Sequence, residues 1–178
     1  RNLEPIYDNE TAIRAFLTVH RRHPDATLTI AGSGPLAGSL RALAESLGLA
    51  GAVIFAGRLD RDAMAQAYRN ADIAINPSLV DNMPNSVLEA LASGVPVVST
   101  NVGGVPYIVN DGQTALLVPA NSPDAMAESI LKLMDDAGLS EKLINNGLTE
   151  VQKYTWQRVW PVLSEVYDQA SHTHRSPA

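Results

Sequence analysis

Five short apolar segments recur along the chain and alternate with stretches of helical periodicity along nearly its whole length. The segments are Thr27–Ala31, Val53–Ala56, Asp72–Asn76, Val95–Thr100 and Ala115–Val118. They are almost unbroken in hydrophobicity, as is typical of strands that are buried on both faces. An alternation of such strands with helices indicates a series of βα units. The sequence therefore predicts an α/β fold in which a doubly wound parallel sheet is flanked by helices.

Capping residues and helix breakers divide the intervening stretches into helices. Helices are expected to begin at Asn9 or Thr11, at Pro35, at Asp60, at Asn85 or Ser86, at Ser122, at Leu139 and at Trp156. Asn, Asp and Ser are good N-caps, and proline fits the first turn of a helix. Gly48 and Gly94 are expected to follow the ends of two helices, because glycine adopts the left-handed conformation that is common there.

The two ends of the chain differ from its middle. Residues 1–170 are expected to form one domain, which suits a length of 178 residues. Arg1–Pro5 has the character of a loop that leaves a strand, so the domain is predicted to be truncated at its N-terminus. Residues 171–178 are polar and lack periodicity, and they are predicted to be a disordered tail.

The composition argues against several classes of function. The chain has no cysteine, which removes disulfides and thiolate chemistry and is compatible with a reducing cytosol. Its net charge is −6 and its Lys and Arg residues do not cluster, so no nucleic-acid partner is expected. No apolar run reaches the roughly 20 residues that span a bilayer, and the N-terminus has no signal-peptide pattern. The four histidines are scattered, so no metal site is predicted. A cytoplasmic protein is expected.

Two acidic residues stand out between the third and fourth predicted strands. Asp81 lies in the loop after a strand, and Glu89 lies one turn inside the following helix. In an open parallel sheet, such loops and helix starts meet at the carboxyl edge of the strands, where ligands bind. The loop Asn82–Asn85 would bring free backbone N–H groups and the positive end of the helix dipole to the same place.

This combination of groups matches the chemistry of a nucleotide sugar. Carboxylates accept hydrogen bonds from the diols of ribose and hexoses, whereas amides and a helix end neutralise a diphosphate. The spacing of the two acids alone allows another interpretation, in which Asp81 forms a turn and Glu89 lies on a solvated helix face. Both interpretations stay open at this point.

Longer runs of residues around the two acids resemble a known enzyme family. They are Pro77-Ser78, Leu88–Val98, Val102–Pro106 with Ile108-Val109, Ile30–Pro35, Val53–Gly57, Ala71-Asp72, Leu116–Pro119 and Tyr154–Trp156. In order and spacing these runs are similar to retaining glycosyltransferases of the GT-B fold, specifically the sucrose-synthase and mannosyltransferase-like group (glycosyltransferase family 4 type). The resemblance covers nearly the whole chain and implies its Rossmann-like C-terminal domain, which binds the sugar donor.

The resemblance also implies roles for individual residues. Asp81 is implied to be the catalytic residue, which contacts hydroxyls of the transferred sugar near the anomeric centre, and Glu89 to hold the ribose diol. The other implied donor-binding residues are Asn82, Met83, Pro84, Asn85, Ser86 and Val87, whose amides would face the donor, together with Arg1, Gly32 and Leu59. Leu59 would lie beside the nucleobase, while Gly32 and Gly34 would let the backbone approach the ligand.

Two positions depart from the family pattern. The first acid is Asp81, whereas the family usually has a glutamate there, which is one methylene longer. The family also carries an Arg and then a Lys that grip the donor diphosphate. Arg1 matches the arginine, but the lysine position falls near Tyr7, which supplies no positive charge.

For the full-length protein, the resemblance implies transfer of a sugar from a UDP- or GDP-linked donor with retention of anomeric configuration. No cofactor or metal ion is implied. The implied partner is an N-terminal acceptor-binding domain of the same protein, toward which a helix containing Trp156 and Trp160 would cross. Peripheral contact of the full-length protein with the inner face of a membrane stays open.

The chain alone is expected to bind donor without turnover. The alternatives are a non-catalytic nucleotide-binding module and a nucleotide-sugar epimerase of the same fold.

Overall fold

The structure of the chain is a computed structural model that describes residues 2–173. Its helices are α1 (Asn9–Arg22), α2 (Ala37–Ser46), α3 (Arg61–Arg69), α4 (Asn85–Ala92), α5 (Val105–Ile108), α6 (Pro123–Asp135), α7 (Ala137–Val151) and α8 (Trp156–Thr173). Its strands are β1 (Leu28–Ala31), β2 (Val53–Gly57), β3 (Ala74–Asn76), β4 (Val97–Thr100) and β5 (Leu116–Val118). Two short 3-10 turns, η1 (Pro5–Tyr7) and η2 (Gln152–Tyr154), precede α1 and α8.

All strand pairs in the described residues are parallel. β1 pairs with β2, and β3, β4 and β5 form a second ladder in that order. The predicted α/β class, with parallel strands flanked by helices, is confirmed. The five strands lie where the sequence predicts them, with ends that differ by one or two residues. The structure refines the prediction by dividing the strands into two ladders.

The first described residues lie between the loops that follow β1 and β3. The N–H of Leu3 donates to the carbonyl of Ser33 at 2.9 Å, and the N–H of Leu36 donates to the carbonyl of Leu3 at 3.0 Å. On the other side, the N–H of Leu79 donates to the carbonyl of Ile6 at 2.9 Å. The segment between Leu3 and Ile6 therefore connects the carboxyl ends of the two ladders.

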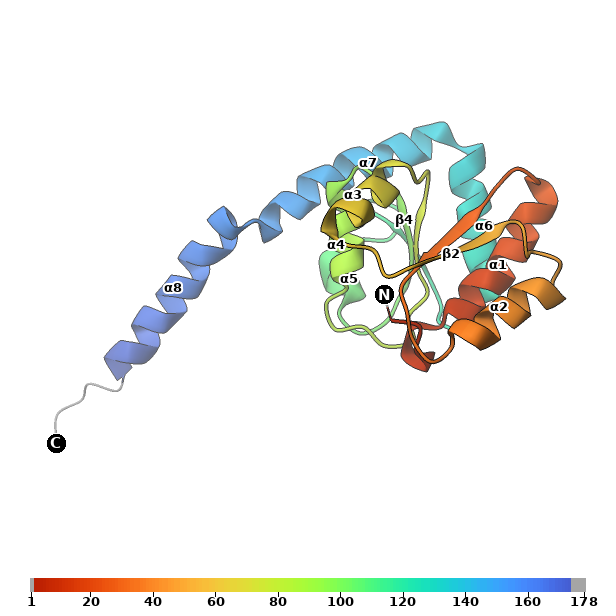
Figure 1. Cartoon of the computed structure of the whole chain (residues 1–178). Coiled ribbons are helices and arrows are strands. Elements are labelled where there is room, and N and C mark those ends of the chain that lie inside the picture. The colour runs from red at the N-terminus through yellow and green to blue at the C-terminus, as the bar shows by residue number, and fades with distance from the viewer. Residues whose placement is uncertain (1, 174–178) are drawn as a thin grey trace.

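Neighbouring residues of β4 face two different hydrophobic cores. Val98, which is fully buried, belongs to a core built largely from α1, α2, β1 and α6, here called the α6 core. Val97 belongs to a core built from α4, α5 and neighbouring residues, here called the α4 core. Adjacent strand residues point to opposite faces, so β4 separates the two cores. Figure 1 shows α1, α2 and α6 on one side of the strands and α3, α4 and α5 on the other.

The sequence predicts the ends of two helices well, but it gives Asn9 or Thr11 as the cap of α1, where the structure has Asp8. α1 begins at Asn9, and the residue that caps it is Asp8, whose carboxylate accepts a hydrogen bond from the N–H of Thr11 at 3.3 Å. Gly48 and Gly94 adopt φ angles of 75° and 69° directly after the ends of α2 and α4. Their left-handed conformation confirms the predicted role of glycine there.

Two helices begin two residues away from their predicted first residues. α2 begins at Ala37, after Pro35, because the chain first makes a turn in which the N–H of Ala37 donates to the carbonyl of Gly34 at 3.1 Å. α7 begins before Leu139, because the carboxylate of Asp136 accepts from the N–H of Leu139 at 2.9 Å and caps the helix earlier.

α8 projects away from the body after η2 (Figure 1). Exposed apolar side chains recur along it at helical spacing, and we call them the α8 stripe: Trp156, Val159, Trp160, Leu163, Val166 and Tyr167. The helix continues to Thr173, so residues 171–173 belong to it and not to the predicted disordered tail. Each residue added to a formed helix gains one backbone hydrogen bond, which lets a helix extend past its last apolar residue. Residues 174–178 lie outside the described residues.

Within residues 2–173, no helix combines the length and the apolarity that a membrane-spanning segment needs.

Candidate functional site

Buried polar side chains join the carboxyl ends of β3 and β4. The Nδ2 of Asn76 donates to Ser99 Oγ at 3.0 Å, and the Oγ of Ser78 donates to Asn76 Oδ1 at 2.9 Å. The Oγ1 of Thr100 donates to the carbonyl of Ser78 at 2.6 Å. None of these four residues, here called the β3–β4 network, is more than 3% exposed. Because buried polar groups must stay hydrogen-bonded, the network fixes the direction in which the chain leaves β3.

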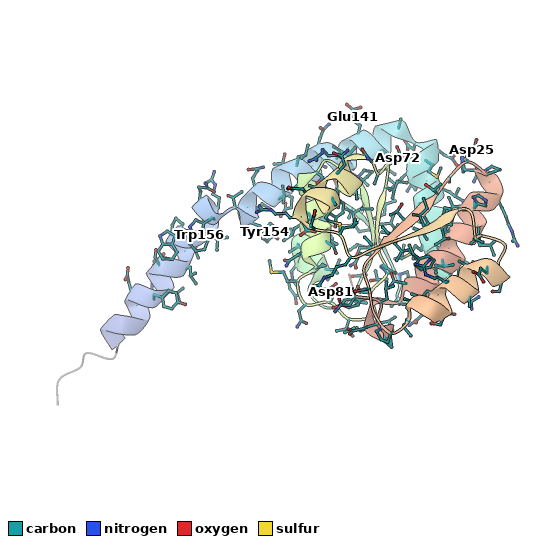
Figure 2. The ribbon with its side chains drawn as sticks, viewed as in Figure 1. Asp25, Asp72, Asp81, Glu141, Tyr154 and Trp156 are labelled. Carbon is teal, nitrogen blue, oxygen red and sulfur yellow. The ribbon has the colours of Figure 1, made fainter. Side chains whose placement is uncertain are left out.

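Asp81 lies on the loop that leaves this network. Figure 2 places Asp81 at the edge of the body opposite Asp25 and Asp72, which precede β1 and β3. It therefore lies at the carboxyl edge of the strands, as the sequence predicts. Only 8% of its surface is exposed, whereas Glu89 is an exposed residue of α4. The two acids thus differ in how much of each carboxylate a ligand can reach.

The loop that carries Asp81 packs directly against Gly103 and Gly104. The N–H of Gly104 donates to the carbonyl of Asp81 at 2.7 Å. A Cβ atom added to Gly103 would collide with the carbonyl oxygen of Asp81, and one added to Gly104 would collide with that of Asn82. The two glycines are therefore needed because two backbone segments touch there.

The start of α4 is open. Pro84 occupies the N-cap position, where no side chain caps the helix, and the N–H of Val87 donates to the carbonyl of Pro84 at 2.9 Å. Four backbone N–H groups here donate to no described residue: those of Asn82, Met83, Asn85 and Ser86. Uncapped N–H groups at a helix start form a site for an anion.

This geometry corrects the predicted set of amide donors at two positions. Pro84 has no N–H, and the N–H of Val87 is used inside the helix, while its side chain is buried in the α4 core. Both residues shape the turn and hold it on the core, but neither can offer an amide to a ligand.

Glu89 is held by a residue of the preceding helix. The hydroxyl of Tyr68, on α3, lies 3.2 Å from Glu89 Oε2 and 3.2 Å from the carbonyl oxygen of Ser86, and it can donate to either. Sequence patterns do not single out Tyr68, because it lies 21 residues before Glu89 and a tyrosine on a helix is usually a packing residue.

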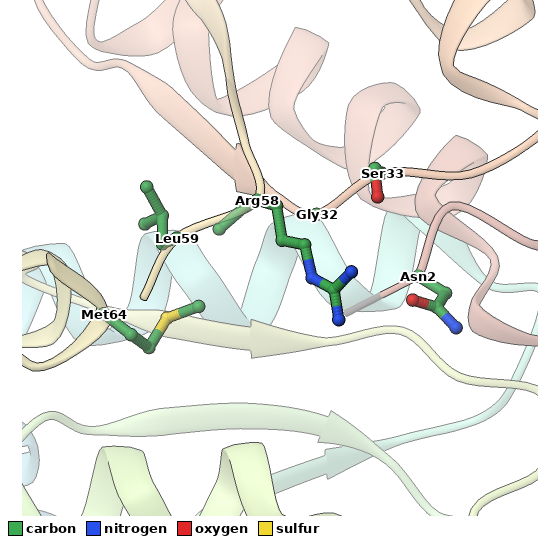
Figure 3. Close-up of a pocket in the computed structure, with 7 residues that line it drawn as sticks. Asn2, Gly32, Ser33, Arg58, Leu59 and Met64 are labelled. Atoms are coloured by element: carbon green, nitrogen blue, oxygen red, sulfur yellow. The ribbon is translucent and has the colours of Figure 1, made fainter. Parts of the chain in front are cut away.

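A pocket lies where β1 and β2 end. The described residues that line it are Asn2, Ala31, Gly32, Ser33, Arg58, Leu59 and Met64, as Figure 3 shows. The structure thus brings together Gly32 and Leu59, two residues that the sequence predicts for the same ligand. In Figure 3 the guanidinium of Arg58 extends toward Asn2, and it has no hydrogen-bond or ion-pair partner among the described residues. Arg58 was not predicted, since an arginine in a βα loop has no distinctive pattern.

The other predicted residues have different surroundings. Gly34 lies against the backbone of Leu3, whose N and O atoms would be 2.6 Å from an added Cβ. It therefore admits the chain's own N-terminal segment and not a ligand, which corrects the prediction. Tyr7 ends η1 and does not line the pocket. The prediction for Arg1 lies outside the described residues.

Tyr154 lies where the chain leaves the body toward α8 (Figure 2). Its hydroxyl lies 3.4 Å from the carbonyl oxygen of Tyr107, the residue that follows Pro106 in α5. Partial burial raises the pKa of the Tyr154 phenol, and the nearby carboxylate of Glu150 adds to this effect. That carboxylate also accepts hydrogen bonds from Lys153, whose pKa is raised mainly by this contact. The Tyr154 hydroxyl thus attaches η2 to α5, and none of these groups lines the pocket.

Within residues 2–173, no three side chains of His, Cys, Asp or Glu lie together in a way that could hold a metal ion.

Comparisons with known proteins agree on one family. A model of the family described as "Glycosyl transferases group 1" matches residues 2–149. A protein of Methanocaldococcus jannaschii described as an uncharacterized glycosyltransferase is 33% identical over 159 residues, which cover 89% of this chain and 40% of that protein. A D-inositol 3-phosphate glycosyltransferase of Acidothermus cellulolyticus is 33% identical over 185 residues, which cover 99% of this chain and 41% of that protein.

Solved structures give the same result for the fold. The C-terminal domain of a glycosyl transferase group 1 family protein (LpcC) from Francisella tularensis has a TM-score of 0.80 at 26% identity, with 87% of this chain and 83% of that chain covered. HepE of Anabaena, in complex with UDP and glucose, has a TM-score of 0.84 at 20% identity, with 97% and 47% covered. The chain spans about two fifths of the length of the curated relatives it matches.

We expect Gly104→Ala to destabilise the chain by about 1–3 kcal/mol, because the new Cβ meets the backbone of Asn82, which cannot move without breaking the contact. Gly104 has a φ of −84°, so alanine adopts its conformation without strain and the collision alone is tested. Urea unfolding measures the change. In the control, Gly51→Ala, no atom lies within 4 Å of the new Cβ, and we expect a change within about 0.5 kcal/mol. Equal stability of the two variants would contradict the close packing of the loops.

Proposed function

The chain belongs to the group 1 glycosyl transferases, and from this premise we propose that it is the nucleotide-sugar-binding domain of a hexosyltransferase. We further propose that the full-length enzyme takes a sugar from a UDP- or GDP-linked donor and transfers it with retention of anomeric configuration. The observation that carries the proposal is the open start of α4, which follows Asp81 at the carboxyl edge of the strands and has Glu89 one turn inside the helix.

Each part of the donor has a group of matching chemistry. Glu89 would accept hydrogen bonds from the two hydroxyls of the ribose, because its carboxylate is exposed. The four free amides of the segment from Asn82 to Ser86 would bind phosphate oxygens, and the dipole of α4 would favour their negative charge. Asp81, of which 8% is exposed, would contact hydroxyls of the transferred sugar.

The pocket at the ends of β1 and β2 would receive the remaining part of the nucleotide. Gly32 has a φ of 146° and no side chain, so a ligand could approach its backbone closely. Leu59 would offer an apolar surface to the nucleobase. Arg58 lines the same pocket and would supply the positive charge that Tyr7 does not supply. Arg58 and Arg1 would together neutralise the diphosphate.

These groups suit a reaction in which the diphosphate leaves. The bond between the anomeric carbon and the phosphate oxygen breaks, and negative charge develops on the phosphate. Prearranged amides, a helix start and arginines stabilise such charge. For retention, the acceptor hydroxyl would attack from the face that the phosphate leaves, and the leaving phosphate would take the hydroxyl proton. The proposal requires neither a metal ion nor a cofactor.

The full-length enzyme would also contain an acceptor-binding domain. The curated relatives are more than twice as long as the part that this chain matches. The α8 stripe supports the proposal, because exposed apolar surfaces of this extent are typical of contact surfaces. An N-terminal domain that packs on α8 would cover the stripe. Peripheral membrane contact and a cytoplasmic location stay predictions for the full-length protein.

We expect the chain to bind UDP or GDP and Glu89→Ala to weaken that binding by about tenfold or more, because two charge-assisted hydrogen bonds to the ribose are lost. Isothermal titration calorimetry measures both affinities. The control is Glu128→Ala, which removes an exposed glutamate of α6, and its affinity should equal that of the unchanged chain. A folded chain that binds neither nucleotide would refute the proposed donor site.

We expect Arg58→Ala to weaken binding of the nucleoside diphosphate by about tenfold and to change binding of the nucleoside by less than about twofold, because the guanidinium acts on the phosphates. Titration with UDP and uridine, or with GDP and guanosine, separates the two effects. Arg21→Ala, a change at an exposed arginine of α1, is the control for a general loss of positive charge. An equal loss for both ligands would place Arg58 beside the base.

For the full-length protein, we expect a panel of UDP- and GDP-sugars with candidate acceptors to give one glycosylated product whose anomeric configuration equals that of the donor. Proton NMR of the product determines the configuration. Inversion would contradict retention while leaving the donor site intact. Conversion of the donor sugar without an acceptor would instead indicate an epimerase.

A further inference from the structure

One hydroxyl group connects α3 to the acid on α4. The Tyr68 hydroxyl is equally far from the carbonyl oxygen of Ser86 and from Glu89 Oε2, at 3.2 Å each. The Tyr68 ring is partly buried and packs against the α4 core. Packing therefore sets the position of the hydroxyl, and the hydroxyl in turn lies between the first turn of α4 and the carboxylate.

Glu89 makes this contact through its carboxylate oxygen Oε2. It is an exposed side chain with three rotatable bonds, and such a side chain loses conformational entropy when a ligand fixes it. Among the described residues, Tyr68 is the one hydrogen-bond partner of the Glu89 carboxylate. The contact involves Oε2, so Oε1 and the remaining lone pairs can accept hydrogen bonds from a ligand.

We propose that Tyr68 is a positioning residue that holds Glu89 in the conformation that accepts both hydroxyls of a ribose, so that the site selects ribonucleotides over deoxyribonucleotides. The inference rests on the proposed function, in which Glu89 binds the ribose. Beyond that function, it assigns to Tyr68, on α3, control of the preference for ribonucleotides over deoxyribonucleotides.

The variant Tyr68→Phe distinguishes a positioning role of Tyr68 from a packing role. In Tyr68→Phe the ring still fills its place against the α4 core, and only the hydroxyl is lost. In this variant the Glu89 side chain loses conformational entropy when a ribose binds, so the affinity for the ribonucleotide falls. A ligand without the 2′ and 3′ hydroxyls makes no contact with Glu89, so its affinity does not depend on the Tyr68 hydroxyl.

The test is a double-mutant cycle measured by calorimetry with two ligands. The proteins are the unchanged chain, Tyr68→Phe, Glu89→Ala and the double variant. The ligands are UDP and 2′,3′-dideoxy-UDP, or the guanine pair if the chain binds GDP better. We expect Tyr68→Phe to weaken UDP binding by about 3–10-fold and dideoxy-UDP binding by less than about twofold. In the Glu89→Ala background, Tyr68→Phe should cause no further loss.

Tyr154→Phe is the matched control, because it removes a hydroxyl whose hydrogen-bond partner among the described residues, the Tyr107 carbonyl, lies 3.4 Å away and outside the pocket. Equal weakening of both ligands by Tyr68→Phe, or the same loss with and without Glu89, would show a structural role and overturn the inference. A silent Tyr68→Phe in a chain whose UDP binding needs Glu89 would overturn the inference alone. A chain that binds neither nucleotide would overturn the proposed function as well.

Discussion

The β3–β4 network is the constraint on which the arrangement of the carboxyl edge depends. Asn76, Ser78, Ser99 and Thr100 are polar side chains in a largely apolar interior, and each has a hydrogen-bond partner there. A buried polar group that loses its partner costs about 1–3 kcal/mol, so the network disfavours any other path for the loop after β3. The loop consequently arrives at Gly103 and Gly104 in one conformation. Their missing side chains let two backbone segments touch, and α4 then begins where its free amides face outward.

Much of the fold follows from the sequence because it depends on local patterns. Short aliphatic runs predict the strands, and the glycines after helices predict the ends of α2 and α4. Two parts of the fold could not be predicted in this way. The division of the strands into two ladders depends on pairing between distant segments. The helical state of residues 171–173 depends on propagation from preceding turns and not on the polarity of those residues.

The candidate site was predicted in outline, and its errors have physical causes. Position after a strand places Asp81 at the carboxyl edge, and the family resemblance names Gly32 and Leu59, which line one pocket; their contacts with a donor stay predictions. A sequence motif cannot show which N–H groups already donate within the protein, or which glycines already pack against the protein's own backbone. The N–H of Val87 belongs to its own helix, and Gly34 makes room for Leu3. Tyr68 and Arg58 escaped prediction for the opposite reason, since their importance arises only from what the fold places beside them.

In the proposed enzyme, a second body would face this domain. Among the groups assigned to the donor, the amides of Asn82, Met83, Asn85 and Ser86 donate to nothing among the described residues. In that state water competes for each of them, and electrostatic stabilisation of a leaving diphosphate is weak in contact with water. The α8 stripe is likewise uncovered, and it begins at Trp156, just beyond the η2 that Tyr154 attaches to α5. In the proposed enzyme, one domain packed on α8 and closing over the carboxyl edge would satisfy both needs, by burying the stripe and by excluding water from the donor.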